Sequence, residues 1–96
     1  MKAISSGLKS ASAVIFDKPC WYLGASLITD TGADDKLTIY DSPDATVTND
    51  TEVDYLQASD EVLNEFHSLN HPVWCSKGIY AKLDADTGDY IIWYAL

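Results

Sequence analysis

The stretch that decides the fold class is residues 79–96, which read IYAKL (79–83), DADTG (84–88) and DYIIWYAL (89–96). The first and last of these runs are rich in aromatic and branched apolar residues, as β-strands are. A five-residue connection that ends in glycine is typical of a hairpin loop. We therefore expect residues 79–83 and 89–96 to pair as a β-hairpin.

A longer run of the same kind covers residues 20–30, CWYLGASLITD. Strand alternation predicts that four apolar side chains share one face of it: Trp21, Leu23, Ala25 and Leu27. Gly24 has no side chain to pack, so it indicates a β-bulge or a close crossing of another backbone. Shorter strands are expected at residues 13–16, 37–40, 52–58 and 73–75.

Residues 59–69, SDEVLNEFHSL, fit two structures. A short helix capped by Ser59 or Asp60 would gather the apolar side chains in one stripe. A strand would instead alternate them between its two faces. In either case Pro72 ends the element, because it disfavours helical geometry at His71.

Short strands at this spacing, with at most one short helix near residues 59–69, predict an all-β fold. We expect one domain over residues 1–96, an antiparallel β-sandwich with jelly-roll-like or Greek-key connections. We predict that the core includes Trp21, Leu23, Leu27, Ile39, Ile79 and Tyr80.

The final strand carries no charge over residues 90–96, YIIWYAL. A strand of a two-layer sandwich has one core face, and its outer face is normally polar. Apolar side chains on both faces therefore predict that a helix, a loop or another protein chain covers the outer side, and we favour another chain. The predicted partner interface is Tyr90, Ile91, Trp93 and Tyr94, with a homo-oligomer as one form of it.

The charge balance excludes several partner classes. The chain has a net charge of −9, with fifteen acidic residues, six lysines and no arginine. Binding to nucleic acid or to an anionic membrane would be electrostatically unfavourable. Eleven of the acidic residues lie in residues 30–65, where we expect them to keep the surface solvated, or else to meet a basic partner. No apolar run is long enough for a signal peptide or a membrane span.

Catalytic and metal chemistry find little support in the sequence. His67, His71 and Cys75 are four residues apart, with Cys20 as a fourth candidate ligand for zinc. Such spacing needs a continuous helix, which Pro72 interrupts, so we expect no metal site and no cofactor. No nucleophile motif or phosphate-binding glycine loop is present, and we expect no enzyme. The two cysteines are expected to be reduced, although one bridge between them remains an alternative.

Several strands together resemble a known class of proteins. LTIYD at residues 37–41, KGIY at 77–80 and Trp93-Tyr94 near the end of the last strand are similar to small β-sandwich structural proteins of tailed bacteriophages. The likeness covers residues 20–41 and 71–96, and its motifs mark turns and strands rather than chemistry.

The resemblance implies a structural protein of the virion, assembled in the host cytoplasm. Such a protein acts through contacts with the major capsid protein or with other virion proteins, as a capsid cement or decoration protein, or as a tail or head–tail adaptor subunit. Two other functions remain open. One is a carbohydrate- or ligand-binding module that uses Trp21, Trp74 or Trp93 as a stacking platform, and the other is an acidic inhibitor that mimics nucleic acid.

Overall fold

The computed structural model describes residues 1–29, 34–59, 63–84 and 88–96, and within them the chain forms eight strands and no helix. The predicted all-β class is therefore confirmed. The strands are β1 (Ile4–Ser5), β2 (Ala13–Phe16), β3 (Cys20–Ile28), β4 (Asp35–Asp41), β5 (Thr51–Ala58), β6 (Asn64–Cys75), β7 (Ile79–Asp84) and β8 (Asp89–Ala95).

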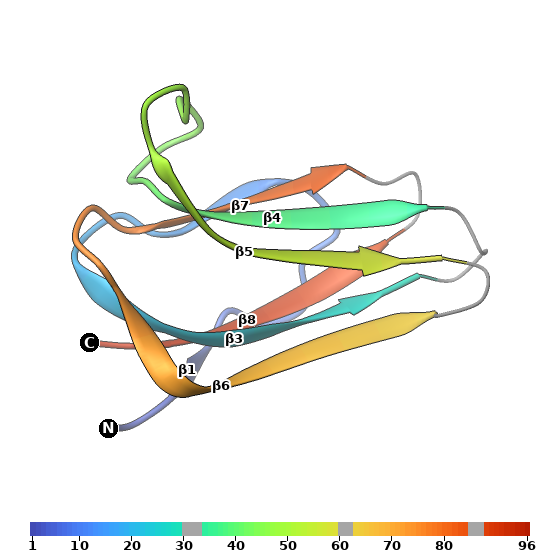
Figure 1. Ribbon diagram of the computed structural model, residues 1–96, viewed down its shortest axis with the longest axis horizontal. Coiled ribbons are helices and arrows are strands. Elements are labelled where there is room, and N and C mark those ends of the chain that lie inside the picture. Colours follow the sequence, from blue (N-terminus) through green and yellow to red (C-terminus); the bar gives the residue numbers. More distant parts are fainter. Residues whose placement is uncertain (30–33, 60–62, 85–87) are drawn as a thin grey trace.

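The strands form two antiparallel sheets of four, which pack face to face (Figure 1). Sheet A has the order β1-β8-β3-β6 and sheet B the order β2-β7-β4-β5. The pairing is nested, because β1 pairs with β8, β2 with β7, β3 with β6 and β4 with β5. This is the order produced by rolling up one long hairpin, so the sandwich is a jelly roll.

The nested order corrects one expectation from the sequence. Residues 79–83 and 89–96 do not pair as a hairpin, because β7 lies in sheet B and β8 lies in sheet A. The connection between them, of which residues 85–87 lie outside the described residues, crosses from one sheet to the other. Each strand buries one of its faces in the core, β7 from sheet B and β8 from sheet A.

The ambiguous stretch 59–69 is a strand where the structure describes it. Asn64–Leu69 forms the first half of β6, and the helical alternative is wrong there, while residues 60–62 lie outside the described residues. Glu65, His67 and Leu69 face inward, so the alternation is that of a strand. The strand then continues past Pro72, but residues 69–72 have no partners on β3, and Val73 resumes the pairing.

Gly24 lies at a β-bulge in β3, as its lack of a side chain indicated. The register with β6 and β8 shifts between Tyr22 and Gly24. Gly24 has φ of +152°, and a Cβ atom there would lie 2.1 Å from the carbonyl oxygen of His67. Only glycine therefore fits this position.

The bulge also reverses the faces of β3. Tyr22 is fully buried before it, and Ala25 and Leu27 are fully buried after it, so Trp21 and Leu23 point away from the core. The prediction that these two residues share a face with Ala25 and Leu27 is wrong, because it assumed an unbroken alternation. Of the predicted core, Leu27, Ile39 and Ile79 are fully buried, whereas Trp21, Leu23 and Tyr80 are half-buried.

The KGIY stretch spans the end of the turn between β6 and β7 (Lys77, Gly78) and the start of β7 (Ile79, Tyr80), and a carboxylate from β4 holds the turn. Asp41 accepts hydrogen bonds from the backbone N–H groups of Ser76, Lys77 and Gly78, at 2.9–3.3 Å. Gly78 has φ of +141°, and a Cβ atom there would lie 2.4 Å from the carbonyl oxygen of Phe16. The motif therefore has a structural role in closing this end of the sandwich.

Candidate functional site

The outward side of sheet A carries a continuous set of apolar side chains, which we call the aromatic face: Trp21, Phe66, Trp74, Ile91 and Trp93. The strand register places them in three cross-strand rows. Trp21 lies between Trp74 and Ala95, Gly24 between Ser68 and Trp93, and Ser26 between Phe66 and Ile91. No residue of these rows is charged, so the face offers apolar contact and a few hydroxyl groups.

Two ring pairs organise the aromatic face. Trp21 and Trp74 meet edge to face with ring centroids 4.9 Å apart, and Phe66 and Trp93 do so at 5.6 Å. Phe66 is 60% exposed and Trp74 is 49% exposed, so each pair has one ring that is open to solvent. Rings held by a neighbouring ring lose little freedom when another molecule packs on them.

A hollow of about 280 Å³ lies beside the Phe66–Trp93 ring pair, at the bulge. Gly24 contributes no side chain, and Phe66 and Trp93 form two of its walls. The hollow is of a size for one apolar side chain or one sugar ring. The residues that line it are Ala3, Leu23, Gly24, Phe66, His67, Ser68, Leu69 and Trp93.

The structure divides the four predicted interface residues between the two sides of β8. Ile91 and Trp93 lie on the aromatic face. Tyr90 is fully buried, and its hydroxyl donates a hydrogen bond to the carbonyl oxygen of Ala11 at 2.7 Å. Tyr94 packs into the sandwich, with its ring centroid 5.4 Å from that of Phe16.

The predicted partner interface lacked three residues of the aromatic face: Trp21, Phe66 and Trp74. Trp21 was expected in the core, and it was otherwise named with Trp74 only as part of a stacking platform. Phe66 lies in the stretch whose strand or helix character was open, so its direction could not be assigned. Trp74 was assigned to a strand, but only the register that sets it opposite Trp21 makes it part of this surface. Cross-strand register between segments about fifty residues apart leaves no local signal in a sequence.

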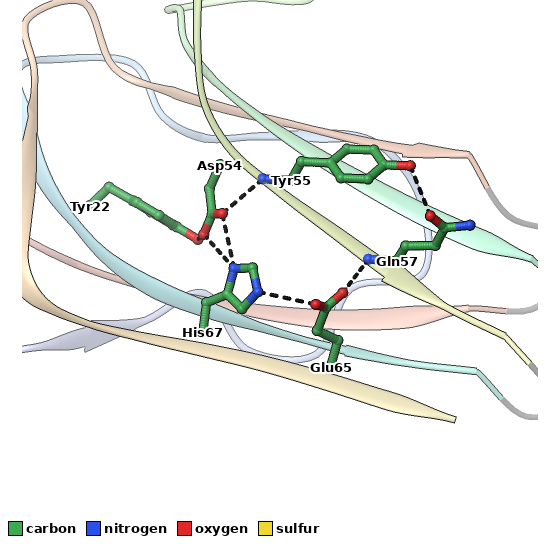
Figure 2. A network of polar contacts seen from close by, with 6 residues as sticks. All are labelled: Tyr22, Asp54, Tyr55, Gln57, Glu65 and His67. Atoms are coloured by element: carbon green, nitrogen blue, oxygen red, sulfur yellow. Dashed lines mark hydrogen bonds and ion pairs between the residues drawn. The ribbon is translucent and has the colours of Figure 1, made fainter. Parts of the chain in front are cut away.

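A second cluster, the polar seam, joins the edge strands of the two sheets (Figure 2). On β6, the Nδ1 atom of His67 lies 2.9 Å from the carboxylate of Asp54 on β5. Its Nε2 atom lies 3.2 Å from the carboxylate of Glu65. The Tyr22 hydroxyl donates to Asp54 at 2.6 Å, and the backbone N–H of Gln57 donates to Glu65. One imidazole therefore links both sheets through two carboxylates.

The charges of the seam determine its protonation. Partial burial alone would lower the pKa of His67, but the hydrogen bond and charge of Asp54, and then those of Glu65, outweigh it and raise the pKa. Burial, followed by the hydrogen bond to Asp54, raises the pKa of Tyr22. Both imidazole nitrogens face carboxylates and neither faces a hydroxyl or thiol, so the geometry is that of a structural link between the sheets.

The two cysteines are cross-strand partners in the core, and both thiols are free and fully buried. Burial, and then the charge of Asp41, raise the pKa of Cys20 to about 11 and that of Cys75 to about 12. His67 belongs to the polar seam and His71 is exposed. Among the residues that the structure describes, no three His, Cys, Asp or Glu side chains come together as a metal-binding group.

No protein-family model, curated protein or solved structure matches this chain. Within the described ranges there is also no helix of the length and apolar character that crossing a membrane requires.

Proposed function

We propose that this chain is a structural protein of a tailed-bacteriophage virion, a capsid cement or decoration protein that acts through protein–protein contacts. The observation that carries the proposal is the aromatic face, an uncharged surface of sheet A with no second layer over the exposed rings of Phe66 and Trp74. The resemblance of residues 20–41 and 71–96 supports it. The jelly roll supports it also, because viral capsid domains are among the proteins with this architecture.

The partner that fits the aromatic face is an apolar surface of the major capsid protein, of another virion protein or of a second copy of this chain. Burying Ile91 and Trp93 contributes about 3–6 kcal/mol of apolar transfer free energy. Lost translational and rotational freedom offsets much of this. Several copies on one shell, or an oligomer of this chain, would therefore be needed for tight attachment.

The test compares one substitution on each outer face. Trp93→Ser removes a ring from the aromatic face, and Tyr55→Ser removes a ring from the outer side of sheet B, where Tyr55 is 41% exposed. Capsids of the phage that encodes the chain, prepared without it, are mixed with each purified variant and sedimented. We expect Trp93→Ser to weaken attachment about 100-fold, as a central aromatic anchor does, and Tyr55→Ser to attach normally.

Circular dichroism of both variants shows whether each still folds, and light scattering reports self-association. If the Trp93→Ser variant attaches as strongly as the unaltered protein, the aromatic face is not the contact surface. Sedimentation with tails or with the head–tail connector, and not with shells, would identify an adaptor subunit. A chain that binds no part of the particle is not a virion protein.

A second candidate function, a carbohydrate-binding module, is favoured by the hollow that Phe66 and Trp93 border. Aromatic walls beside the Ser68 hydroxyl are the kind of surface on which a sugar ring stacks. Titration with oligosaccharides would then change the tryptophan fluorescence of the unaltered protein. Trp93→Ser would abolish that change, whereas a protein whose fluorescence is constant does not use the hollow for sugars.

A further inference from the structure

One end of the sandwich carries acidic residues at the ends of three strands, β4, β7 and β8. The register places Ile28 beside Asn64 and Asp89, Asp35 beside Ala58, and Lys36 beside Asp84, so these strand ends lie together at the end shown on the right in Figure 1. Residues 29–35, 59–63 and 84–89 hold eight of the fifteen acidic residues and no lysine. They are Asp30, Asp34, Asp35, Asp60, Glu61, Asp84, Asp86 and Asp89, of which the structure describes Asp34, Asp35, Asp84 and Asp89.

Asp35 differs from the other described acids of this end because it points into the protein. Its side chain lies on the inward side of β4, as do those of Leu37 and Ile39. Asp35 is the first residue of β4, so it is the inward position of this strand nearest to the end of the sandwich. The side chain is 0% exposed. Across the described residues, neither of its carboxylate oxygens has a hydrogen-bond donor.

Thr29 repeats the pattern on sheet A. It follows Leu27 with the same inward phase, directly beyond the end of β3, and is 3% exposed. Its hydroxyl oxygen is likewise without a hydrogen-bond partner in the described part of the chain. Three buried oxygen atoms therefore lie unsatisfied at the inner rim of the acidic end, one on a hydroxyl and two on a carboxylate.

A buried carboxylate without a donor or a counter-charge is costly, and native proteins rarely keep one without a ligand or an ion. The nearest lysine in the sequence, Lys36, has the opposite phase and is exposed on the outer side of sheet B beside Asp84. A cation held against the Asp35 oxygens would supply the missing counter-charge. The other described acids of this end, Asp34, Asp84 and Asp89, would attract it.

We propose that Asp35 and Thr29 bind a divalent cation, Ca²⁺, at the acidic end of the sandwich. Ca²⁺ takes six to eight oxygen ligands in flexible geometry, and water completes the shell where the protein does not. A carboxylate and a hydroxyl are oxygen ligands, and no thiol or imidazole side chain is among the described residues of this end. The proposal is independent of the aromatic face, which lies on the outer side of sheet A.

The experiment measures thermal unfolding of the full chain after treatment with a chelator, with and without CaCl₂ at about 10 mM, which saturates even a weak site. The reference sample contains NaCl at the same ionic strength. We expect Ca²⁺ to raise the Tm by about 5–15 °C relative to NaCl. Calorimetric titration with CaCl₂ gives the stoichiometry, which we expect to be one.

Three variants assign the effect to named atoms. Asp35→Asn removes the buried charge, and we expect it to lose the Ca²⁺-dependent rise in Tm. Asp34→Asn removes one exposed charge at the same end, and we expect this variant to keep most of the Ca²⁺-dependent rise in Tm. Asp17→Asn removes one exposed charge at the opposite end, and we expect it to keep the whole rise. Thr29→Val removes the hydroxyl at nearly constant volume, and we expect it to weaken Ca²⁺ affinity several-fold.

If Asp35→Asn does not fold, Thr29→Val carries the assignment. The proposal is overturned if Ca²⁺ raises the Tm of the unaltered protein no more than NaCl does. It is equally overturned if the rise persists in Asp35→Asn, or if Asp34→Asn abolishes it to the same extent. Failure of capsid attachment would leave this result unaffected, because the two surfaces share no residue.

Discussion

The two sheets treat the same residue type in opposite ways. Each sheet holds three of the six tyrosines of the chain. Sheet A turns Tyr22, Tyr90 and Tyr94 inward, and it places all three tryptophans and Phe66 on its outer side. Sheet B turns Tyr40, Tyr55 and Tyr80 outward, among Lys36, Lys82, Glu52 and Asp84. Most of its inward side chains are aliphatic, and Phe16 is its inward aromatic residue among those packed against the core.

The difference shows that aromatic content by itself does not mark the core. Inward tyrosines need fixed partners, and Tyr22 and Tyr90 have them in Asp54 and the carbonyl of Ala11. The outward tyrosines of sheet B keep their hydroxyl groups at a surface shared with charged side chains. The outward rings of sheet A have neither hydroxyl groups nor charged neighbours in their rows, so this is the face for which a partner is needed.

The largest effect is expected where the bulge sets the direction of the aromatic face. Gly24→Ala places a Cβ atom against the His67 carbonyl and strains the backbone, so we expect a loss of about 3–5 kcal/mol in unfolding free energy. Gly7→Ala is the matched control, since its φ is +73° but no atom lies within 4 Å of the new Cβ. It should cost only about 1 kcal/mol.

Urea denaturation of both variants measures this difference. An equal loss in the two would mean that only backbone conformation matters at Gly24. The close approach of β6 to β3 at Gly24 would then not be what determines which side chains of sheet A face outward.

The sequence predicted much of this fold and little of the site. Alternation identified the all-β class and most strands, and Gly24 was correctly associated with a bulge. Its consequence for Trp21 and Leu23 was missed, because a bulge changes the phase of all residues beyond it. The partition of β7 and β8 between two sheets, and the meeting of Asp54 with His67, depend on pairings between distant segments, which composition and period do not encode.

A smaller effect should sharpen the contrast between inward and outward tyrosines. Tyr22→Phe removes a buried hydroxyl that donates a hydrogen bond to the Asp54 carboxylate at 2.6 Å. The carboxylate keeps the His67 imidazole and the backbone N–H of Tyr55 as partners, so the loss is that of one hydrogen bond to a charged group, about 1–3 kcal/mol. Tyr55→Phe removes a hydroxyl 3.5 Å from Gln57 at the surface, and the loss should stay within about 0.5 kcal/mol. Denaturant midpoints of the two variants give the comparison. Equal losses of unfolding free energy in the two variants would show that the hydrogen bond from the Tyr22 hydroxyl adds no stability.

The smallest effect concerns the polar seam, where the two sheets meet. The folded protein raises the pKa of His67 above 6.5, chiefly because the carboxylates of Asp54 and Glu65 outweigh partial burial. Folding therefore favours the protonated imidazole. Its contribution is fully present below about pH 6.5 and is lost as the pH rises through the raised pKa. A partly exposed pair of this kind is worth about 0.5–1 kcal/mol.

The measurement that isolates the seam is the unfolding free energy at about pH 6 and about pH 9, taken for the unaltered protein, His67→Gln and His71→Gln. The chain has two histidines, and His71 is exposed, so its substitution is the matched control. We expect His67→Gln to flatten the fall in stability between the two pH values, whereas His71→Gln should follow the unaltered protein. If all three show the same fall, another group causes it, and the link between β5 and β6 does not depend on the charge of His67.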